Sequence, residues 1–415
     1  MNILIINHYA GAPELGREFR PYYLARAWQQ AGHRVLVAAA DHSHLRSNDP
    51  VLGGPTEQRT IGGVEYLLFA TPRYNDSIAG RGRNIGAFVA RLWRAAPRLA
   101  RDFGPNVVLG QSGYPFEYGP ARRIAALAGA PLVTELRDLW PLCLQEQYHY
   151  RGGHPAVVLA AQALRRQLAA SGLVVTVLPG AAEYLSGYGL PEGRCAVVPA
   201  GIAVPKGVAP PPAAHVRQLA RWREKGLLTV MYCGNIGADH DLRSFVESAA
   251  RLRGEALLVL VGNGGSKIPL KRRAKELGLD NVLFLDGVPR GQIQGMMEQS
   301  DCLFFPVRPD GQLRYGAASS KLLGYMLAGR PVLCDRPFAH NPAEEAGCCL
   351  TAAAPDAAGL AAGVRAAAAL GAERRREMGE KGERFVRETR DYRLLAQTYL
   401  ELLTGLKTGQ DTPQS

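Results

Sequence analysis

The sequence lacks several features that would place it in a specialised class of protein. No apolar run approaches the roughly 18 residues of a membrane-spanning helix, and there is no internal repeat. The seven cysteines form no spaced pairs of the kind that bind zinc or build a disulfide framework, so we expect reduced thiols and no metal site. A predicted strand begins at once, over Asn2 to Asn7, without a basic leader, which favours a cytoplasmic location over secretion.

Nucleic-acid motifs are also missing, although the chain carries a net charge of +12. No zinc finger, basic heptad region or aromatic RNA-binding signature accompanies the charge, so we expect no nucleic-acid partner. All lysines lie at or after Lys206, and the basic residues before it, histidines apart, are arginines. This usage is consistent with phosphate recognition or with the base composition of the gene. A basic chain also makes an anionic membrane surface a candidate partner.

The length and composition indicate two globular domains. The 415 residues are 47% hydrophobic and 21% charged, and each half is long enough to bury a core. Strand and helix patterns alternate in both halves, which predicts the α/β class with parallel sheets. A proline-rich stretch from Pro205 to Pro212 separates the halves. The predicted parts are an N-terminal domain (1–204), a linker (205–226), a C-terminal domain (227–375) and C-terminal helices (376–407).

A stretch late in the chain gives the strongest indication of function. A strand is predicted over Cys302 to Val307, followed by a helix that carries Lys321 in its first turn and ends at Gly329, where Pro331 forces a return to strand. A helix start at the carboxyl edge of a parallel sheet favours anions, and Lys321 adds a formal positive charge there. We therefore expect Lys321 to bind a diphosphate, with a solvated surface lysine as the alternative.

Two glycine-rich turns support the diphosphate interpretation. The first follows a predicted strand over Leu227 to Met231, and the second follows one over Leu257 to Val261. Glycines at strand-to-helix junctions let backbone amides approach a phosphate closely, although most such glycines only end an element. The turn residues predicted to join Lys321 in one site are Gly234, Asn235, Gly237, Gly262 and Asn263.

The loop after the first predicted strand is a second candidate for ligand binding. It is rich in glycine and leads into arginines at the start of a helix predicted over 17–31. This composition suits the lip of a ligand site at the carboxyl edge of a sheet. Arginines that merely solvate the helix are the alternative. The predicted lip residues are Gly11, Glu14, Arg17 and Arg20.

The stretch from Arg81 to Arg101 contains no acidic residue. On a helix, the arginines at positions 91, 94, 98 and 101 fall within roughly 80° of arc, while apolar residues occupy another face. This basic face predicts binding to an anionic membrane, with a solvated face of a helix packed on the sheet as the alternative. Pro97 is expected to kink the helix.

The motifs of the C-terminal half occur together in one known family. They are Gly-Asn-Ile-Gly (234–237), Val-Gly-Asn-Gly (261–264), Asn-Val-Leu-Phe-Leu (281–285), Pro-Arg (289–290) and Ser-Lys-Leu-Leu-Gly-Tyr-Met-Leu-Ala-Gly-Arg-Pro-Val (320–332). This series resembles the donor domain of family 4 retaining glycosyltransferases and is most similar to the bacterial surface-polysaccharide branch. In the N-terminal half, Arg-x-x-Arg-Pro-Tyr-Tyr-Leu-Ala-Arg (17–26) and Arg-Asp-Leu-Trp-Pro (137–141) are similar to the same branch.

The resemblance implies a GT-B fold, in which two Rossmann-like β/α/β domains face each other across a cleft and the C-terminal helices return toward the first domain. It implies a nucleotide diphosphate sugar as donor substrate, with no metal and no other cofactor. Lys321, Arg137 and Asp138 would be catalytic, and Ser320 would join the donor site. The expected reaction transfers a hexosyl or N-acetylhexosaminyl group, with retention of configuration, to a glycan or lipid-linked polysaccharide precursor. The expected location is the cytoplasm, peripheral to the inner face of the plasma membrane.

The sequence departs from the family pattern at its carboxylates. The family's two glutamates, separated by seven residues, would fall at Gly316 and Gly324, and the second usually binds the nucleotide ribose. Glu344 or Glu345, at the predicted start of a later helix, is the expected replacement. The two glycines also support another hypothesis, in which the chain is a catalytically degenerate homologue that acts as a scaffold in a polysaccharide assembly complex.

One acidic cluster imitates a metal site. Asp239-His240-Asp241 is similar to the Asp-x-Asp motif of a different glycosyltransferase fold, but aspartate at a helix start is more often an N-cap, so we expect no metal there. His240 and Asn235 also stand where many relatives carry the lysine and arginine that grip the diphosphate. A nucleotide-sugar epimerase of similar fold is a third alternative, which release of free diphosphate during turnover would exclude.

Overall fold

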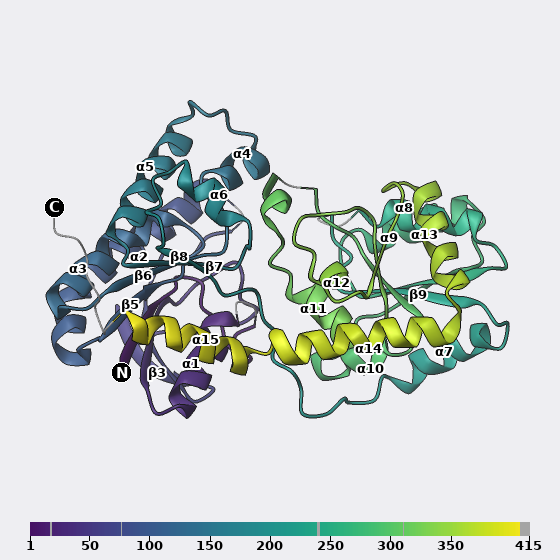
Figure 1. Ribbon diagram of the computed structural model, residues 1–415, viewed down its shortest axis with the longest axis horizontal. Coiled ribbons are helices and arrows are strands. Elements are labelled where there is room, and N and C mark those ends of the chain that lie inside the picture. The colour runs from purple at the N-terminus through teal and green to yellow at the C-terminus, as the bar shows by residue number, and fades with distance from the viewer. Residues whose placement is uncertain (17–18, 76, 239–240, 310, 407–415) are drawn as a thin grey trace. The chain divides into compact units, whose positions relative to one another are not determined.

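The computed structural model describes residues 1–16, 19–75, 77–238, 241–309 and 311–406 (Figure 1). This part of the chain forms two α/β units. The first comprises Met1–Ala203, Arg314–Ala318 and the C-terminal helix α15 (Tyr392–Gly405). The second comprises Val204–Leu313 and Ser319–Asp391.

The sheet of the first unit has eight strands in the order β3-β4-β2-β1-β5-β6-β7-β8. Neighbouring strands are parallel, except that β3 and β4 form an antiparallel hairpin. The strands are β1 (Asn2–Ile6), β2 (Arg34–Ala40), β3 (Thr56–Ile61), β4 (Val64–Phe69), β5 (Val107–Gly110), β6 (Leu132–Leu136), β7 (Leu173–Thr176) and β8 (Cys195–Val197).

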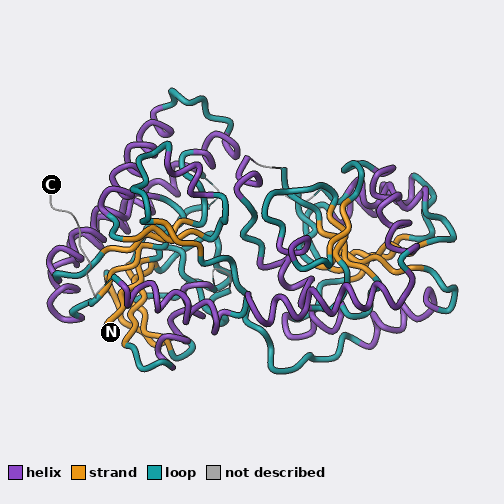
Figure 2. Tube along the Cα trace, in the orientation of Figure 1, coloured by secondary structure: helices purple, strands orange, loops and turns teal. Residues whose placement is uncertain are grey.

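Helices cover both faces of this sheet (Figure 2). Alternate residues of β1 pack into different cores, because both faces of a strand inside a parallel sheet are buried. On one face, the indole N–H of Trp28 in α1 donates to the carbonyl of Ala396 in α15 at 2.8 Å, so the C-terminal helix completes this core. The helices are α1 (Arg20–Gln30), α2 (Ile78–Arg98), the 3₁₀ turn η2 (Pro115–Glu117), α3 (Tyr118–Ala128), α4 (Leu142–Tyr148), α5 (Pro155–Ala170) and α6 (Ala181–Ser186).

Pro97 lies in the last turn of α2, but the helical path continues beyond it. Proline cannot donate to the carbonyl four residues earlier, which is that of Trp93. Arg123 of α3 donates to this carbonyl at 3.0 Å and places its guanidinium 4.7 Å from the centre of the Trp93 ring. The helix then continues as a π-helical turn, η1 (Leu99–Phe103), which ends at Gly104. The proline therefore produces a change of helix type, with its lost hydrogen bond replaced by a side chain.

The second unit contains a six-stranded parallel sheet in the order β11-β10-β9-β12-β13-β14. The strands are β9 (Leu228–Cys233), β10 (Ala256–Val261), β11 (Val282–Leu285), β12 (Cys302–Phe305), β13 (Val332–Cys334) and β14 (Cys349–Thr351). The helices are α7 (Ala213–Arg223), α8 (Arg243–Ser248), η3 (Ala249–Arg251), α9 (Lys267–Glu276), η4 (Arg290–Gln292), α10 (Ile293–Met297), α11 (Ser320–Leu327), α12 (Pro342–Glu345), α13 (Ala357–Ala369) and α14 (Gly371–Thr389), and the 3₁₀ turn η5 (Gly311–Tyr315) joins segments of both units.

The predicted α/β class with two Rossmann-like domains is confirmed. The segment 205–226, expected as a linker, contains helix α7. The two C-terminal helices belong to different units: α14 is part of the second, and α15 is part of the first. The hairpin strand β3 was not predicted, because its alternating polar residues leave only a weak strand pattern.

Candidate active site

Two interlocked glycine turns lie at the carboxyl ends of β9 and β10. Gly234, Gly262 and Gly264 have φ angles of 155°, 153° and 150°, a region that favours glycine. A Cβ atom on Gly262 would overlap the carbonyl oxygen of Gly234, so the two turns approach each other more closely than any side chain allows. The N–H of Ile236 donates to the carbonyl of Asn263 at 2.8 Å, which fastens the first turn to the second.

Lys321 points from the first turn of α11 to the first of these glycine turns. Ser319 caps the helix by accepting the N–H of Leu322 at 3.2 Å. A Cβ atom on Gly234 would lie 2.8 Å from Nζ of Lys321, so the ammonium stands directly against the glycine backbone. Nζ donates to Oη of Tyr232 at 2.7 Å. The structure thus brings together Lys321 and the glycine turns that the sequence placed at one sheet edge.

The charge of Lys321 is not balanced by a carboxylate. Within the described part of the chain this lysine forms no ion pair. Burial lowers the pKa of Lys321 to about 7 and raises the pKa of the neighbouring Cys233 thiol to about 11, so the thiol stays neutral. The pKa values of Tyr232 and Tyr325 are also raised by burial. A half-buried ammonium among neutral groups and backbone amides is suited to an anion.

A second lysine near the turns, Lys267, has a different role, and no motif singled it out. Nζ of Lys267 donates to the carbonyls of Gly262 at 2.8 Å and Leu285 at 2.9 Å, and to Oδ1 of Asp286 at 2.7 Å. A longer contact of 3.4 Å reaches Oδ1 of Asn263. Lys267 is therefore a satisfied cation that fixes the ends of β10 and β11.

Other residues predicted to bind the donor are Asn235, Gly237 and Ser320, of which the first two form close contacts within the first glycine turn. The carbonyl of Asn235 accepts the hydroxyl of Tyr232 at 2.5 Å. A Cβ atom on Gly237 would lie 2.6 Å from Nδ2 of Asn235, so this turn is also tight. Ser320 is exposed at the start of α11. Asp241 accepts the N–H of Arg243 at 3.2 Å, as a cap of α8 would, and the rest of its acidic cluster, Asp239 and His240, lies outside the described residues.

The two glutamates expected near the ribose have partners elsewhere in the second unit. Oε1 of Glu344 accepts the hydroxyl of Thr351 at 3.2 Å. Glu345 is largely exposed, and its Oε2 lies 3.6 Å from Nη2 of Arg390. Both side chains therefore interact around β14 and the end of α14. A ribose contact would require either glutamate to exchange its present partner.

Asp335 is a buried carboxylate that the sequence did not single out. It follows β13 directly, and its Oδ1 accepts the N–H of Val307 at 2.8 Å. Oδ2 lies 3.3 Å from Nη2 of Arg336. Burial raises the pKa of Asp335. The only local signal is an aspartate after a short apolar strand, a pattern too common to predict burial.

Arg20, predicted at a ligand lip, lies inside the first unit. Its side chain is 3% exposed, and it forms a two-pronged ion pair with Glu135 at 2.9 and 3.1 Å. It also donates to the carbonyls of Val198 and Pro199, each at 2.9 Å. These contacts use the guanidinium to join α1, β6 and the end of β8. The placement of Arg20 is therefore that of a structural ion pair.

Of the other predicted residues of the first unit, those that the structure describes lie at the carboxyl edge of its sheet. Gly11 is buried and its carbonyl accepts the hydroxyl of Tyr66 at 2.8 Å, whereas Glu14 is exposed. Arg17 lies outside the described residues. Arg137 and Asp138 follow β6, and Oδ2 of Asp138 lies 3.2 Å from the place where a Cβ of Gly113 would stand, which puts the ends of β5 and β6 side by side.

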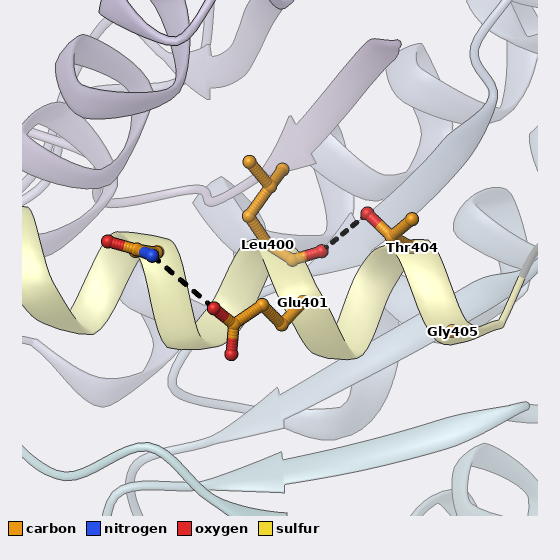
Figure 3. A pocket seen from close by; sticks show the side chains of 5 residues that line it. Leu400, Glu401, Thr404 and Gly405 are labelled. Carbon is orange, nitrogen blue, oxygen red and sulfur yellow. Dashed lines mark hydrogen bonds between the residues drawn. The ribbon is translucent and has the colours of Figure 1, made fainter.

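Two surface hollows of the first unit lie away from this edge. One, of about 450 Å³, is lined by residues of α15 alone (Figure 3). Its polar side chains form hydrogen bonds within this helix. Nε2 of Gln397 donates to Glu401 at 3.4 Å, and the hydroxyl of Thr404 donates to the carbonyl of Leu400 at 2.8 Å. The other, of about 420 Å³, lies beside α4, α5 and α6. Neither contains a predicted site residue.

The described residues contain neither a metal-binding cluster nor a membrane-spanning helix. No group of three or more histidine, cysteine, aspartate or glutamate side chains there is arranged to hold a metal ion. In the same residues, no helix combines the length and the apolar character that crossing a membrane requires.

Both halves of the sequence match families of known proteins. Residues 16–201 match the family described as "Glycosyl transferase 4-like domain", and residues 220–385 match "Glycosyl transferases group 1". The chain is built from two glycosyltransferase-family domains. The fold is accordingly the two-domain GT-B fold, and solved structures of glycosyltransferases share it over almost the whole chain.

Individual relatives are distant or match only a short segment. A putative colanic acid biosynthesis glycosyl transferase, WcaI, of Escherichia coli (strain K12) is 35% identical over 74 residues, which are 18% of this chain and 18% of that protein. HepE of Anabaena, solved in complex with UDP, is 14% identical, with a TM-score of 0.66 and coverage of 98% and 100% of the two chains. WaaG, a glycosyltransferase involved in lipopolysaccharide biosynthesis, is 18% identical, with a TM-score of 0.63 and coverage of 97% and 100%.

Proposed function

We propose that this glycosyltransferase moves a sugar from a nucleotide diphosphate sugar to a glycan or lipid-linked precursor of a bacterial surface polysaccharide. The observation that carries the proposal is the half-buried ammonium of Lys321, which stands against the glycine turns without a carboxylate partner among the described residues. The putative role of WcaI in colanic acid biosynthesis, the role of WaaG in lipopolysaccharide biosynthesis and the UDP bound to HepE support the same substrate classes.

The proposed reaction retains the anomeric configuration and uses no metal or other cofactor. Negative charge develops on the leaving diphosphate, and the ammonium of Lys321 with the N–H groups of the glycine turns would stabilise it. Gly234 and Gly262 allow the backbone to approach the phosphates. Arg137 and Asp138 would act in the first unit, where the exposed carboxylate of Asp138 suits an acceptor hydroxyl. The transferred group would be a hexosyl or N-acetylhexosaminyl residue.

Donor binding to Lys321 can be tested by calorimetry. Nucleotide sugars are first screened against the wild type, and the best ligand is then measured with Lys321→Ala. A charge-assisted hydrogen bond contributes about 1.5 to 3 kcal/mol, so binding or turnover should weaken roughly 10- to 150-fold. Lys225→Ala, which removes an exposed lysine of the same unit, is the matched control and should bind as the wild type does. Unchanged kinetics of Lys321→Ala would overturn the assignment.

A second candidate function is that of a non-catalytic scaffold within a polysaccharide assembly complex. The observation that favours it is glycine at positions 316 and 324, where the family carries glutamates. The calorimetric screen separates the two candidates. Binding of a nucleotide sugar with turnover supports the enzyme, whereas no binding at millimolar concentration supports the scaffold.

The proposed location is the cytoplasm, peripheral to an anionic membrane that presents the lipid-linked acceptor. The supporting feature is the basic face of α2 and η1, beside which Trp93 is 46% exposed. Part of this charge is balanced within the protein. Arg98 and Arg101 lie 3.4 and 2.8 Å from carboxylate oxygens of Asp102, and Arg91 donates to the carbonyl of Ala70. Membrane binding would therefore depend on the surplus of positive charge on this face.

A further inference from the structure

Tyr232 provides the one hydrogen bond that Lys321 forms among the described residues. Its ring lies under the ammonium, with Nζ 3.9 Å from the ring centre and 2.7 Å from Oη. The direction of the hydrogen bonds follows from the chemistry, because an ammonium can only donate. Oη of Tyr232 must therefore accept from Lys321 and donate its own proton to the carbonyl of Asn235, 2.5 Å away. One hydroxyl thus fixes both the lysine and the first glycine turn.

We propose that Tyr232 is a positioning residue for donor binding, which holds the ammonium of Lys321 against Gly234 in the place that a carboxylate usually fills for a buried lysine. The inference rests on the proposed function, because the diphosphate is the ligand for which Lys321 is positioned. It adds a residue in the middle of the donor site that no motif of the sequence indicated.

Lys267, a buried lysine of the same unit, shows how a carboxylate partner differs from the partner of Lys321, which is Tyr232. Lys267 has a carboxylate and two carbonyls within 2.9 Å, so all three of its N–H groups have strong acceptors. Lys321 has one acceptor among the described residues, and its two other N–H groups would bind phosphate oxygens. A carboxylate in place of Tyr232 would neutralise the ammonium and compete with the diphosphate. The phenol stays neutral, since burial raises its pKa, and therefore holds the lysine without competing.

Among the described residues, no other side chain near the ammonium of Lys321 accepts a hydrogen bond from it. The ring of Tyr325 lies 5.9 Å away, and its hydroxyl is occupied with the backbone of Cys233, accepting the N–H and donating to the carbonyl at 2.9 Å each. Among the described titratable groups, the Cys233 thiol is the one whose charge would raise the pKa of Lys321. Because the pKa of this thiol is itself raised, the thiol stays neutral. The hydroxyl and ring of Tyr232 are therefore the main groups that stabilise the charged form of Lys321.

The test compares Tyr232→Phe with Tyr325→Phe. Each change removes one buried hydroxyl and keeps the ring, but only the first hydroxyl touches the lysine. The pKa of Lys321 is measured by NMR on lysine-labelled protein without donor, and the Lys321→Ala variant assigns the signal. Tyr232→Phe should lower the pKa of Lys321 below its wild-type value of about 7, because the charged form loses its acceptor. Tyr325→Phe should leave this pKa unchanged.

Affinity for a nucleotide sugar gives the second readout. At pH 7.5 Tyr232→Phe should weaken binding about tenfold, the effect of one lost hydrogen bond to a charged group. The deficit should shrink at pH 6, where the lysine regains its proton. Equal pKa values and affinities in Tyr232→Phe and the wild type would overturn the proposal, as would equal effects of the two tyrosine variants. If the wild type binds no nucleotide sugar, the proposed function itself fails, which is a separate result.

A stability cycle keeps the proposal testable if Tyr232→Phe alone does not fold. In a Lys321→Met background no ammonium needs an acceptor, so Tyr232→Phe should cost less unfolding free energy there than Tyr325→Phe costs in the same background. If Tyr232→Phe costs as much unfolding free energy in this background as Tyr325→Phe does, Tyr232 stabilises the fold independently of Lys321. That result would contradict the pairing of Tyr232 with Lys321.

Discussion

Arg20 of the first unit and Lys321 of the second are both cations near the carboxyl edge of a sheet, but of these two only Arg20 meets a carboxylate among the described residues. Arg20 of the first unit meets the carboxylate of Glu135 and two carbonyls. Lys321 of the second unit meets only Tyr232 among the described residues. A buried charge without a partner is destabilising, so proteins keep one mainly where a ligand supplies the counter-charge. A basic residue at a sheet edge therefore indicates a ligand site mainly when the protein itself supplies no counter-charge for it.

The largest expected effect comes from breaking the balanced pair. Arg20→Ala leaves Glu135 buried without its counter-charge and should lower the free energy of unfolding by about 3 to 5 kcal/mol. Urea denaturation measures the loss. The control is Arg365→Ala, which breaks an exposed ion pair with Glu255 at 2.7 Å and should leave the free energy of unfolding nearly unchanged, because solvent screens the pair. Equal stability of the two variants would show that Arg20 is not the structural cation described here.

Removing the unbalanced charge should have the opposite sign. The folded-state pKa of Lys321, about 7, lies below its ordinary value of 10.5. Between these values the unfolded chain holds a proton that the folded protein has lost, so this group makes stability rise with pH, and its full cost is present below pH 7. Lys321→Met should therefore be more stable than the wild type at pH 6, by roughly 2 to 4 kcal/mol, with a smaller gain at pH 10.

Urea titrations at pH 6, 8 and 10 measure this difference. Lys225→Met, a change of the same chemistry at an exposed position, should show no comparable gain at any of these pH values. A Lys321→Met variant that is less stable than the wild type at pH 6 would mean that the ammonium is already compensated in the free protein.

A smaller effect is expected at the basic face of the first unit. Replacing its four arginines with glutamine should release the protein from anionic liposomes at low salt, since each basic residue near such a surface contributes up to about 1 kcal/mol. High salt should release the wild type as well. The control replaces four exposed arginines of α14, Arg374, Arg376, Arg384 and Arg387, with glutamine and should keep binding. A wild type that never sediments with the liposomes would leave the face merely solvated.

The smallest effect is expected from restoring the family carboxylate. Gly324→Glu places an acid on α11, three residues after Lys321. If another group already accepts the ribose hydroxyls, nucleotide-sugar affinity measured by calorimetry should change little. The new carboxylate would also partly balance the lysine, which opposes any gain. A gain of about tenfold or more, within the 1 to 3 kcal/mol of a restored hydrogen bond, would show that the ribose contact was simply missing.

The sequence predicted those parts of the fold that depend on local patterns. Strands β1 and β10 differ by only one residue from the predicted ranges Asn2 to Asn7 and Leu257 to Val261, because continuous apolar runs indicate buried parallel strands. The glycine turns and the helix that carries Lys321 were also predicted, since glycine and proline mark such junctions strongly. The hairpin strand β3 was missed because alternating polar residues at a sheet edge give little hydrophobic signal.

The partners of the charged side chains could not be predicted in the same way. Arg20 and Glu135 are 115 positions apart, and Tyr232 and Lys321 are 89 apart. Such pairs depend on how strands and helices come together, and a local pattern contains no information about that. For this reason, residue type and position alone could not show that Arg20 forms an internal ion pair. They also could not decide whether Lys321 binds a ligand or is a solvated surface lysine.

Proton uptake during donor binding tests most directly whether the diphosphate is the missing counter-charge of Lys321. Calorimetric titrations with the best nucleotide sugar, in buffers of different ionisation enthalpy at pH 7.5, report the number of protons taken up. With a free-protein pKa of about 7, the wild type should take up roughly 0.5 to 0.8 proton as the lysine becomes charged, and Lys321→Met should take up none. Binding without proton uptake in the wild type, or equal uptake in both proteins, would contradict the account.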